Sequence, residues 1–191
     1  MSGSYLTNPL VFLVQTFAGL YALVVMLRFL LQLTRADFYN PVSHFVVKVT
    51  TPVLAPLRRI VPSARGLDLS PLLLAWLVKT LELGIVALLA DSAANPLGAL
   101  LWALPALLAL TINILLFALL IRVILSWVNP DPYNPIGSLL DSLTAPVMRP
   151  AQRLIPPVGG LDLSPILVMV GLVLLEMLLL PPLKLLTGSP F

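Results

Sequence analysis

The chain has no cysteine, a single histidine, His44, and few charged residues. Only 10% of its 191 residues are Asp, Glu, Lys or Arg, whereas an ordinary soluble domain is about 25% charged. The lack of cysteine excludes disulfides, thiolate metal sites and covalent c-type haem attachment, and one histidine cannot form a bis-histidine site. We therefore predict no cofactor and no metal site. So few charges could not cover a soluble core of this size, which predicts an integral membrane protein.

Apolar residues are abundant instead, at 59% of the chain. A bilayer span needs about 20 consecutive apolar residues. Four stretches are long enough, over residues 9–33, 69–90, 97–128 and 163–186. The first has no basic leading segment and too long an apolar run for a cleavable signal peptide. The sequence thus predicts an all-α protein with four transmembrane helices.

The hexapeptide GLDLSP occurs twice, at residues 66–71 and 160–165. An offset of 94 aligns the two halves without a gap and gives 18 identities over the 44 positions 28–71. Most of these identities are Pro, Asp, Arg, Asn or Gly in the connecting regions, so chance matching of leucine-rich helices does not explain them. The chain is an internal duplication, with repeats at residues 1–94 and 95–191. Each repeat has two spans, which predicts equal orientation and a pseudo-two-fold axis along the membrane normal.

The link between the two spans of each repeat has the signature of a helix start. Asn40 and Asn134 are each followed by proline, as an N-cap is followed by proline at the first helical position. Pro52 and Pro146 are expected to end or kink the helix after about ten residues, or about 15 Å. Because apolar residues keep helical spacing on one face, we predict an amphipathic helix lying in the interface. A shallow re-entrant hairpin is the alternative.

GLDLSP itself is typical of the entry into a transmembrane helix. Ser70 and Ser164 are predicted to cap the following helices, with proline at the first helical position. Asp68 and Asp162 precede these positive helix ends, and Gly66 permits a tight reversal of the chain.

The two aspartates suggest a role beyond marking the start of a helix, because capping alone would accept many sequences. We predict a tie from the aspartate to Arg59 or Arg153, or else a contact with a partner or ligand. The purely structural reading of the hexapeptide stays open beside this one.

Basic residues are unevenly distributed between the two sides of the predicted membrane. The links carry Arg35, Lys48, Arg58, Arg59, Arg65, Arg149 and Arg153, and only Lys184 lies on the opposite side. The positive-inside rule then places both links in the cytoplasm and both termini outside. Anionic lipid headgroups are expected near Arg58 and Arg59.

Charged residues also occur inside the predicted spans. Glu82 and Glu176 lie about 16 Å into their helices, near the bilayer midplane, where a charge costs at least about 2.5 kcal/mol. Lys79 is placed to pair with Glu82, and Glu176 needs another partner or stays protonated. Arg28 and Arg122 either snorkel as interface anchors or reach towards the glutamates. We predict that both glutamates face the interface between the repeats, as packing contacts or as a polar binding path.

The paired pattern of arginine, Asp-x-Tyr-Asn-Pro, Thr-x-Pro, Pro-x-x-Arg-x-x-Pro and GLDLSP resembles the YggT family of bacterial inner-membrane proteins. The resemblance covers nearly the whole chain. It implies an inner-membrane location and links to osmotic or salt tolerance, to cell division and nucleoid organisation, and in plastid relatives to haem attachment during cytochrome b6 maturation. It implies no catalytic residue.

Three classes of function are consistent with these features. An enzyme fits least, because the sequence offers no nucleophile with a base and no phosphate-binding loop. A non-enzymatic assembly or scaffold factor fits best, with another membrane protein or a second copy as its partner and no nucleic acid bound directly. A small oligomeric transporter or channel for ions or osmolytes is the alternative.

Overall fold

The computed structural model of the protein describes residues 3–37, 40–61, 66–89, 96–128, 134–154 and 162–190. Its four long helices are α1 (Gly3–Leu33), α3 (Ser70–Leu89), α4 (Ala99–Val128) and α6 (Ser164–Thr187). All four are long and apolar enough to cross a membrane. The four predicted spans are therefore confirmed, although α1 begins six residues before the predicted start at Pro9.

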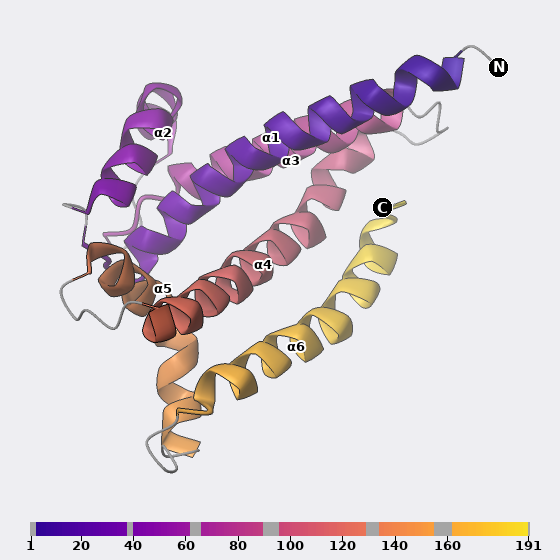
Figure 1. Cartoon of the computed structure of the whole chain (residues 1–191). Coiled ribbons are helices and arrows are strands. Elements are labelled where there is room, and N and C mark those ends of the chain that lie inside the picture. The colour runs from indigo at the N-terminus through magenta and orange to yellow at the C-terminus, as the bar shows by residue number, and fades with distance from the viewer. Residues whose placement is uncertain are drawn as a thin grey trace.

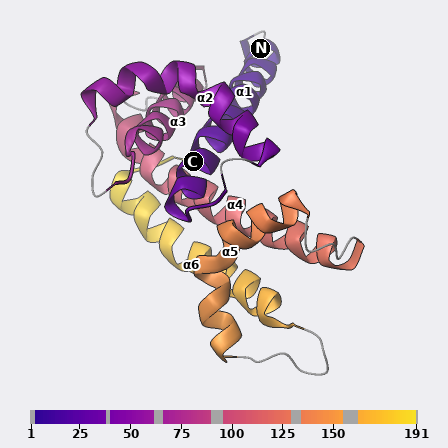
Figure 2. The same ribbon diagram turned by 90° about the vertical axis from the view of Figure 1, so that its left-hand side faces the viewer.

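Two further helices, α2 (Pro41–Ile60) and α5 (Pro135–Leu154), join the spans within each repeat, and the short 3-10 helix η1 (Pro96–Gly98) precedes α4. The predicted length of about ten residues is wrong, because each of α2 and α5 has 20 residues, or about 30 Å. The helices continue through Pro52 and Pro146 and bend instead of ending (Figure 2). A proline removes one backbone hydrogen bond and kinks a helix, while the turns on either side persist.

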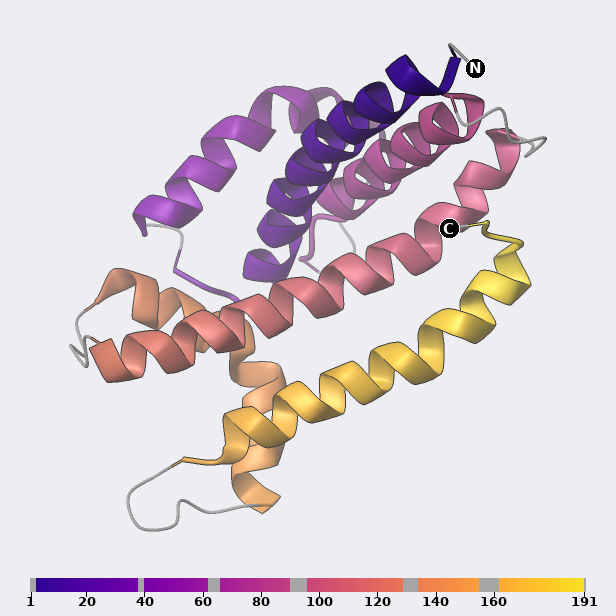
Figure 3. The ribbon, with the colours of Figure 1, turned by 45° about the vertical axis from the view of Figure 1, so that its right-hand side comes forward.

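The long helices form an open row rather than a closed ring. In sequence order, α1 packs on α3, α3 on α4, and α4 on α6, and Figures 1 and 3 show α6 at one edge of this row. Among the described residues, α1 and α6 form no extended contact. The predicted pseudo-two-fold axis relates α1 to α4 and α3 to α6, so it would place α6 against α1 just as α3 lies against α4. The predicted axis is therefore wrong for the single chain. The free faces of α1 and α6 lie at opposite ends of the row.

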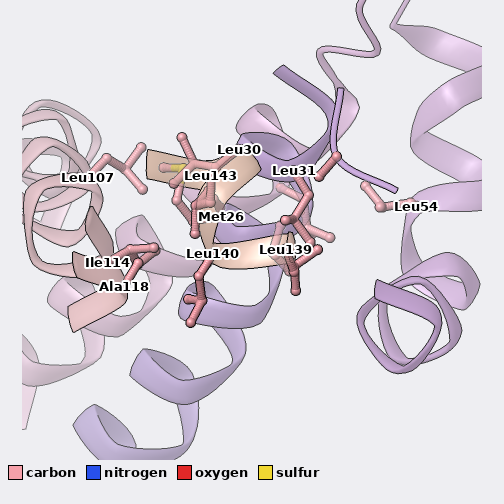
Figure 4. Packing of buried hydrophobic residues seen from close by; sticks show 14 residues of the cluster. Met26, Leu30, Leu31, Leu54, Leu107, Ile114, Ala118, Leu139, Leu140 and Leu143 are labelled. Carbon is pink, nitrogen blue, oxygen red and sulfur yellow. The ribbon is translucent and has the colours of Figure 1, made fainter. Parts of the chain in front are cut away.

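Both repeats contribute to one hydrophobic cluster at the end of the row near α2 and α5 (Figure 4). Its labelled members come from α1, α2, α4 and α5, and they are Met26, Leu30, Leu31, Leu54, Leu107, Ile114, Ala118, Leu139, Leu140 and Leu143. Together with Leu74 and Ala75 of α3, which belong to the same cluster, these side chains are buried against one another, and this fixes the linking helices against the spans.

Candidate functional site

The two linking helices begin as the sequence predicts. Asn40 accepts a hydrogen bond from the backbone N–H of Val42 at 2.9 Å, and Asn134 accepts one from the N–H of Ile136 at 2.9 Å. Both asparagines therefore satisfy a free donor at a helix start. The Asn40 amide also donates to the carbonyl oxygen of Pro135. This second bond joins the starts of α2 and α5, and so joins the two repeats.

The capping assignment within GLDLSP must be corrected. The side-chain oxygens of Asp68 and Asp162 accept hydrogen bonds from the backbone N–H groups of Ser70 and Ser164, at 3.0 and 2.9 Å. Each serine is the first helical residue. The N-cap of α6 is Leu163, whose side chain makes no capping bond. The aspartates, rather than the serines, thus hold the turn through an Asx-type hydrogen bond to the residue two positions on.

Gly66 has φ of 80°, in the left-handed region that favours glycine. This is the backbone conformation for which the predicted reversal needs a glycine. Its counterpart, Gly160, lies outside the described residues.

Each aspartate has a second partner on the preceding helix, but not the predicted one. Asp68 forms an ion pair with Arg58, whose Nε donates to Oδ2 at 2.7 Å. Asp162 accepts a hydrogen bond from the Gln152 amide at 3.1 Å. Residues 58 and 152 are equivalent under the offset of 94.

Arg59 and Arg153, the partners predicted for these aspartates, are instead exposed. Adjacent helical residues point about 100° apart, so only one of Arg58 and Arg59 can face the turn. The repeats thus keep the position of the contact and change its chemistry from ion pair to amide bond.

The carboxyl of Asp68 is held in its ionised form. Partial burial by itself would raise the pKa of Asp68, but hydrogen bonds from Ser70 and Arg58 and the charge of Arg58 outweigh it and lower this pKa below its ordinary value. The pKa of Asp162 is also lowered. There burial again acts to raise it, while hydrogen bonds from Ser164 and Gln152 and the charge of Arg122 lower it.

Acid should therefore loosen the entry into α3. A depressed native pKa adds stability that is present above the unfolded pKa of about 4 and is lost as the pH falls through the native value. We expect the difference in thermal unfolding temperature between the wild type and Asp68→Asn, measured in detergent, to be largest near pH 7. This difference should shrink as the pH is lowered below about 4. A difference that grows towards low pH would contradict the assignment.

Arg28 neither snorkels nor reaches a glutamate. Its side chain is buried, with 6% of the residue exposed, and points at α2. Its Nη1 donates to the carbonyl of Val47 at 3.2 Å and to the hydroxyls of Thr50 and Thr51 at 2.5 and 3.1 Å. Arg28 is thus a buried tie between the first span and its linking helix.

Arg122, the equivalent residue of the second repeat, is held differently. Its Nε pairs with the carboxylate of Asp141, the residue equivalent to Val47. The Arg122 side chain is 27% exposed and that of Asp141 is 60% exposed. A pocket of about 290 Å³ opens beside this ion pair between α4 and α5, lined by Arg122, Asp141, Ser142, Thr144, Ala145, Met148, Arg149 and Gln152. Charges of both signs at its wall make it suited to small polar groups.

The embedded glutamates have opposite surroundings. Glu82 is buried and pairs with Lys79 at 2.9 Å, and the two side chains are 7% and 15% exposed. The predicted pairing of these residues is confirmed. Glu176 is partly exposed and has no hydrogen-bond or ion-pair partner among the described residues. Position 173, which corresponds to Lys79, is Val173.

The prediction that both glutamates face the interface between the repeats fails for Glu176. Its helix α6 packs on α4 and α5, which belong to the same repeat. The reason is the open row: α3 has neighbours on two sides, whereas α6 lies at the edge. Glu82 lies on a helix that packs on both α1 and α4.

Asp141, Arg149 and Thr51 were not among the candidate site residues predicted from the sequence. The signal that could have found them is divergence at equivalent positions, since Asp141, Arg149 and Ala145 stand where the first repeat has Val47, Ala55 and Thr51. No group of three or more metal-ligating side chains occurs within the described ranges.

Comparison with known proteins identifies the family. The model of the CCB3/YggT family matches residues 7–89 and again residues 101–183. An uncharacterized protein of Pseudomonas aeruginosa is 42% identical over 187 residues, covering 97% of this chain and 95% of its own length. The uncharacterized protein YggT of Escherichia coli is 38% identical over 172 residues, covering 89% and 88%. No solved structure matches the chain. The chain is a multi-pass membrane protein that belongs to the CCB3/YggT family.

Proposed function

We propose that this protein is a non-enzymatic membrane assembly or scaffold factor, which acts by receiving a further transmembrane helix on α6. The observation that carries the proposal is Glu176, a carboxyl without a partner among the described residues, on the least buried of the four spans. An ionisable group near the bilayer midplane is costly when it faces lipid. A partner helix that supplies a polar contact would remove that cost.

The duplication makes this argument stronger. Glu82, at the equivalent position, is closed off by Lys79 and by neighbouring helices within the chain. The same carboxyl has therefore been retained in a buried setting and in a partly exposed one. Polar side chains commonly hold membrane helices together, so the partly exposed Glu176 is the candidate for contact with another chain.

The proposed placement in the bacterial inner membrane puts α2 and α5 along the cytoplasmic surface and both termini outside. Each of these helices buries one stripe of residues against the spans, which in α2 is Ser43, Val46, Thr50 and Leu54. Arg59 is exposed near the end of α2, where it is available to anionic headgroups. In this arrangement the assembly function serves the cell envelope under osmotic stress.

The topology can be tested directly. We expect a cysteine at Arg58 or Arg149 to react with an impermeant maleimide only after the cytoplasmic side is opened, because the positive-inside rule places both links there. A reporter fused after Phe191 should be active outside the cytoplasm. Labelling of either position from outside in intact cells would reverse the orientation.

Crosslinking in native membranes tests the function. A photoreactive amino acid at Glu176 should capture a protein, because this side chain is partly exposed and has no hydrogen-bond or ion-pair partner among the described residues. The matched control is the same probe at Leu81 of α3, which is 65% exposed and carries no buried charge. Capture at position 176 alone supports an assembly role. Capture of lipid only at both positions, combined with ion flux in proteoliposomes, would favour the transporter.

A further inference from the structure

We propose that the partner on α6 is α1 of a second copy of this chain, docked as α4 docks on α3 within one chain. This inference rests on the proposed function and names its partner. The two repeats make α1 equivalent to α4 and α3 equivalent to α6. The contact between α3 and α4 joins the two repeats inside the chain. The equivalent contact, between α6 and α1, is not formed within one chain.

The α3–α4 contact has a defined set of residues. Leu83 and Ala87 of α3 cluster with Ala99 and Trp102 of α4. These four residues are all less than 9% exposed. Gly84 also lies at this contact, because a Cβ placed on it would be in ordinary van der Waals contact with the Cβ of Ala99, at 3.7 Å.

The equivalent surface of α6 is bare. Met177 stands for Leu83 and is 66% exposed, and Pro181 stands for Ala87 and is also exposed. Glu176 is the immediate neighbour of Met177, just as Glu82 is of Leu83. Lipid alone would explain bare apolar residues on a membrane helix. It does not explain a carboxyl retained in the same register beside them.

The equivalent surface of α1 is bare as well and offers a polar group. Asn8 stands for Trp102, and Phe12 stands for Ala106, which packs against the α3–α4 cluster. Asn8 is exposed and Phe12 is 65% exposed. Docking in the same register would bring the Asn8 amide of one copy beside Met177 and Glu176 of the other. An amide that donates to a carboxyl is a contact that membrane helices use.

The geometry of the row allows the contact to close. Both repeats have the same orientation in the membrane because each has two spans, so α1 of a second copy runs in the direction that α4 runs beside α3. The free faces of α6 and α1 lie at opposite ends of the row (Figure 3). A two-fold dimer about the membrane normal would form the contact twice and leave neither face bare.

The chain has no cysteine, so engineered cysteines report on this contact without background. Two differently tagged chains, one carrying Asn8→Cys and the other Met177→Cys, would be expressed together and treated with a short bismaleimide in native membranes. We expect a product of twice the monomer mass that carries both tags. In a second pair that keeps Asn8 and carries Phe12→Cys instead, the yield should fall several-fold when Glu176→Leu is added to the chain with Met177→Cys, because the contact between the Asn8 amide and the Glu176 carboxyl is then lost.

Two matched pairs make the result interpretable. Leu83→Cys with Trp102→Cys in one chain should crosslink internally, which verifies the contact from which the docking is inferred. Met177→Cys paired with Phe117→Cys on the second chain should not crosslink, although Phe117 is 63% exposed. A product with position 117 equal to that with position 8 would indicate random collision and overturn the inference. An internal crosslink without any product between chains would also overturn the inference.

In that last case the probe at Glu176 separates the two proposals. Capture of a different protein would leave the assembly function supported, whereas no capture at all would contradict both the dimer contact and the assembly function.

Discussion

Replacing Arg28 with alanine should destabilise the protein far more than the same change at Arg122, although the two arginines are equivalent in the duplicated sequence. Arg28 is buried and donates three hydrogen bonds to α2. Arg122 makes a partly exposed ion pair with a carboxylate that is 60% exposed. The expected readout is the free energy of unfolding in detergent micelles, measured for both variants against the wild type.

The magnitudes follow from the surroundings. A hydrogen bond to a charged group contributes about 1.5–3 kcal/mol to stability. Removing the buried guanidinium also removes the cost of taking its charge out of water, and this offsets part of the lost hydrogen-bond energy. We therefore expect Arg28→Ala to cost about 3 kcal/mol. An exposed ion pair contributes about 0.2–1 kcal/mol, so Arg122→Ala should cost less than about 1 kcal/mol.

Arg28→Lys is the control that separates charge from geometry. A lysine keeps the positive charge but has one ammonium group at the end of a flexible chain, and it cannot reproduce the fixed guanidinium. We expect it to recover only part of the loss. Equal losses for Arg28→Ala and Arg122→Ala would show that the buried contacts with Thr50 and Thr51 contribute no net stability.

The sequence was informative where local chemistry decides the structure. Apolar length alone located the four spans to within a few residues, apart from the start of α1. The Asn-Pro pairs located the starts of α2 and α5, because an N-cap followed by proline is a local signal. The spacing of Lys79 and Glu82 was sufficient to predict their pairing, since both lie on one face of one helix.

The sequence was less informative where the answer depends on the path of the chain. The partner of Arg28 could not be inferred, because it depends on how α2 packs against α1 and brings Thr50 and Thr51 to Arg28. The choice of Arg58 over Arg59 as partner of Asp68 depends on the rotation of α2 about its axis. The setting of Glu176 depends on the open row, and the symmetry of the repeats alone suggested a closed one.

The differences between the repeats follow from substitutions at equivalent positions. Asp141, in the place of Val47, draws its arginine to a side-chain carboxylate, and Ala145, in the place of Thr51, removes one hydroxyl acceptor. The first repeat is thereby closed around its arginine and the second keeps a pocket. The second repeat also lacks the lysine that neutralises the embedded glutamate. Both changes leave charged or ionisable side chains of the second repeat accessible to other molecules.

The embedded pair of Lys79 and Glu82 should show strong coupling when its members are changed one at a time. Lys79→Met leaves a carboxyl with no cation in a site where Glu82 is 6% exposed. Breaking a buried ion pair on one side costs about 3–5 kcal/mol. We expect a loss of about 3 kcal/mol in the free energy of unfolding in micelles.

The double variant Lys79→Met with Glu82→Gln should recover most of that loss, because a buried ion pair can often be replaced by neutral groups of similar volume without harm. Glu82→Gln alone should be tolerated better than Glu82→Lys, since the amide keeps hydrogen bonding while the lysine adds a second positive charge beside Lys79. The comparison variant is Glu176→Gln, which removes no partner among the described residues and should leave the unfolding of the monomer nearly unchanged. Additive losses at positions 79 and 82 would show that the pair is not coupled.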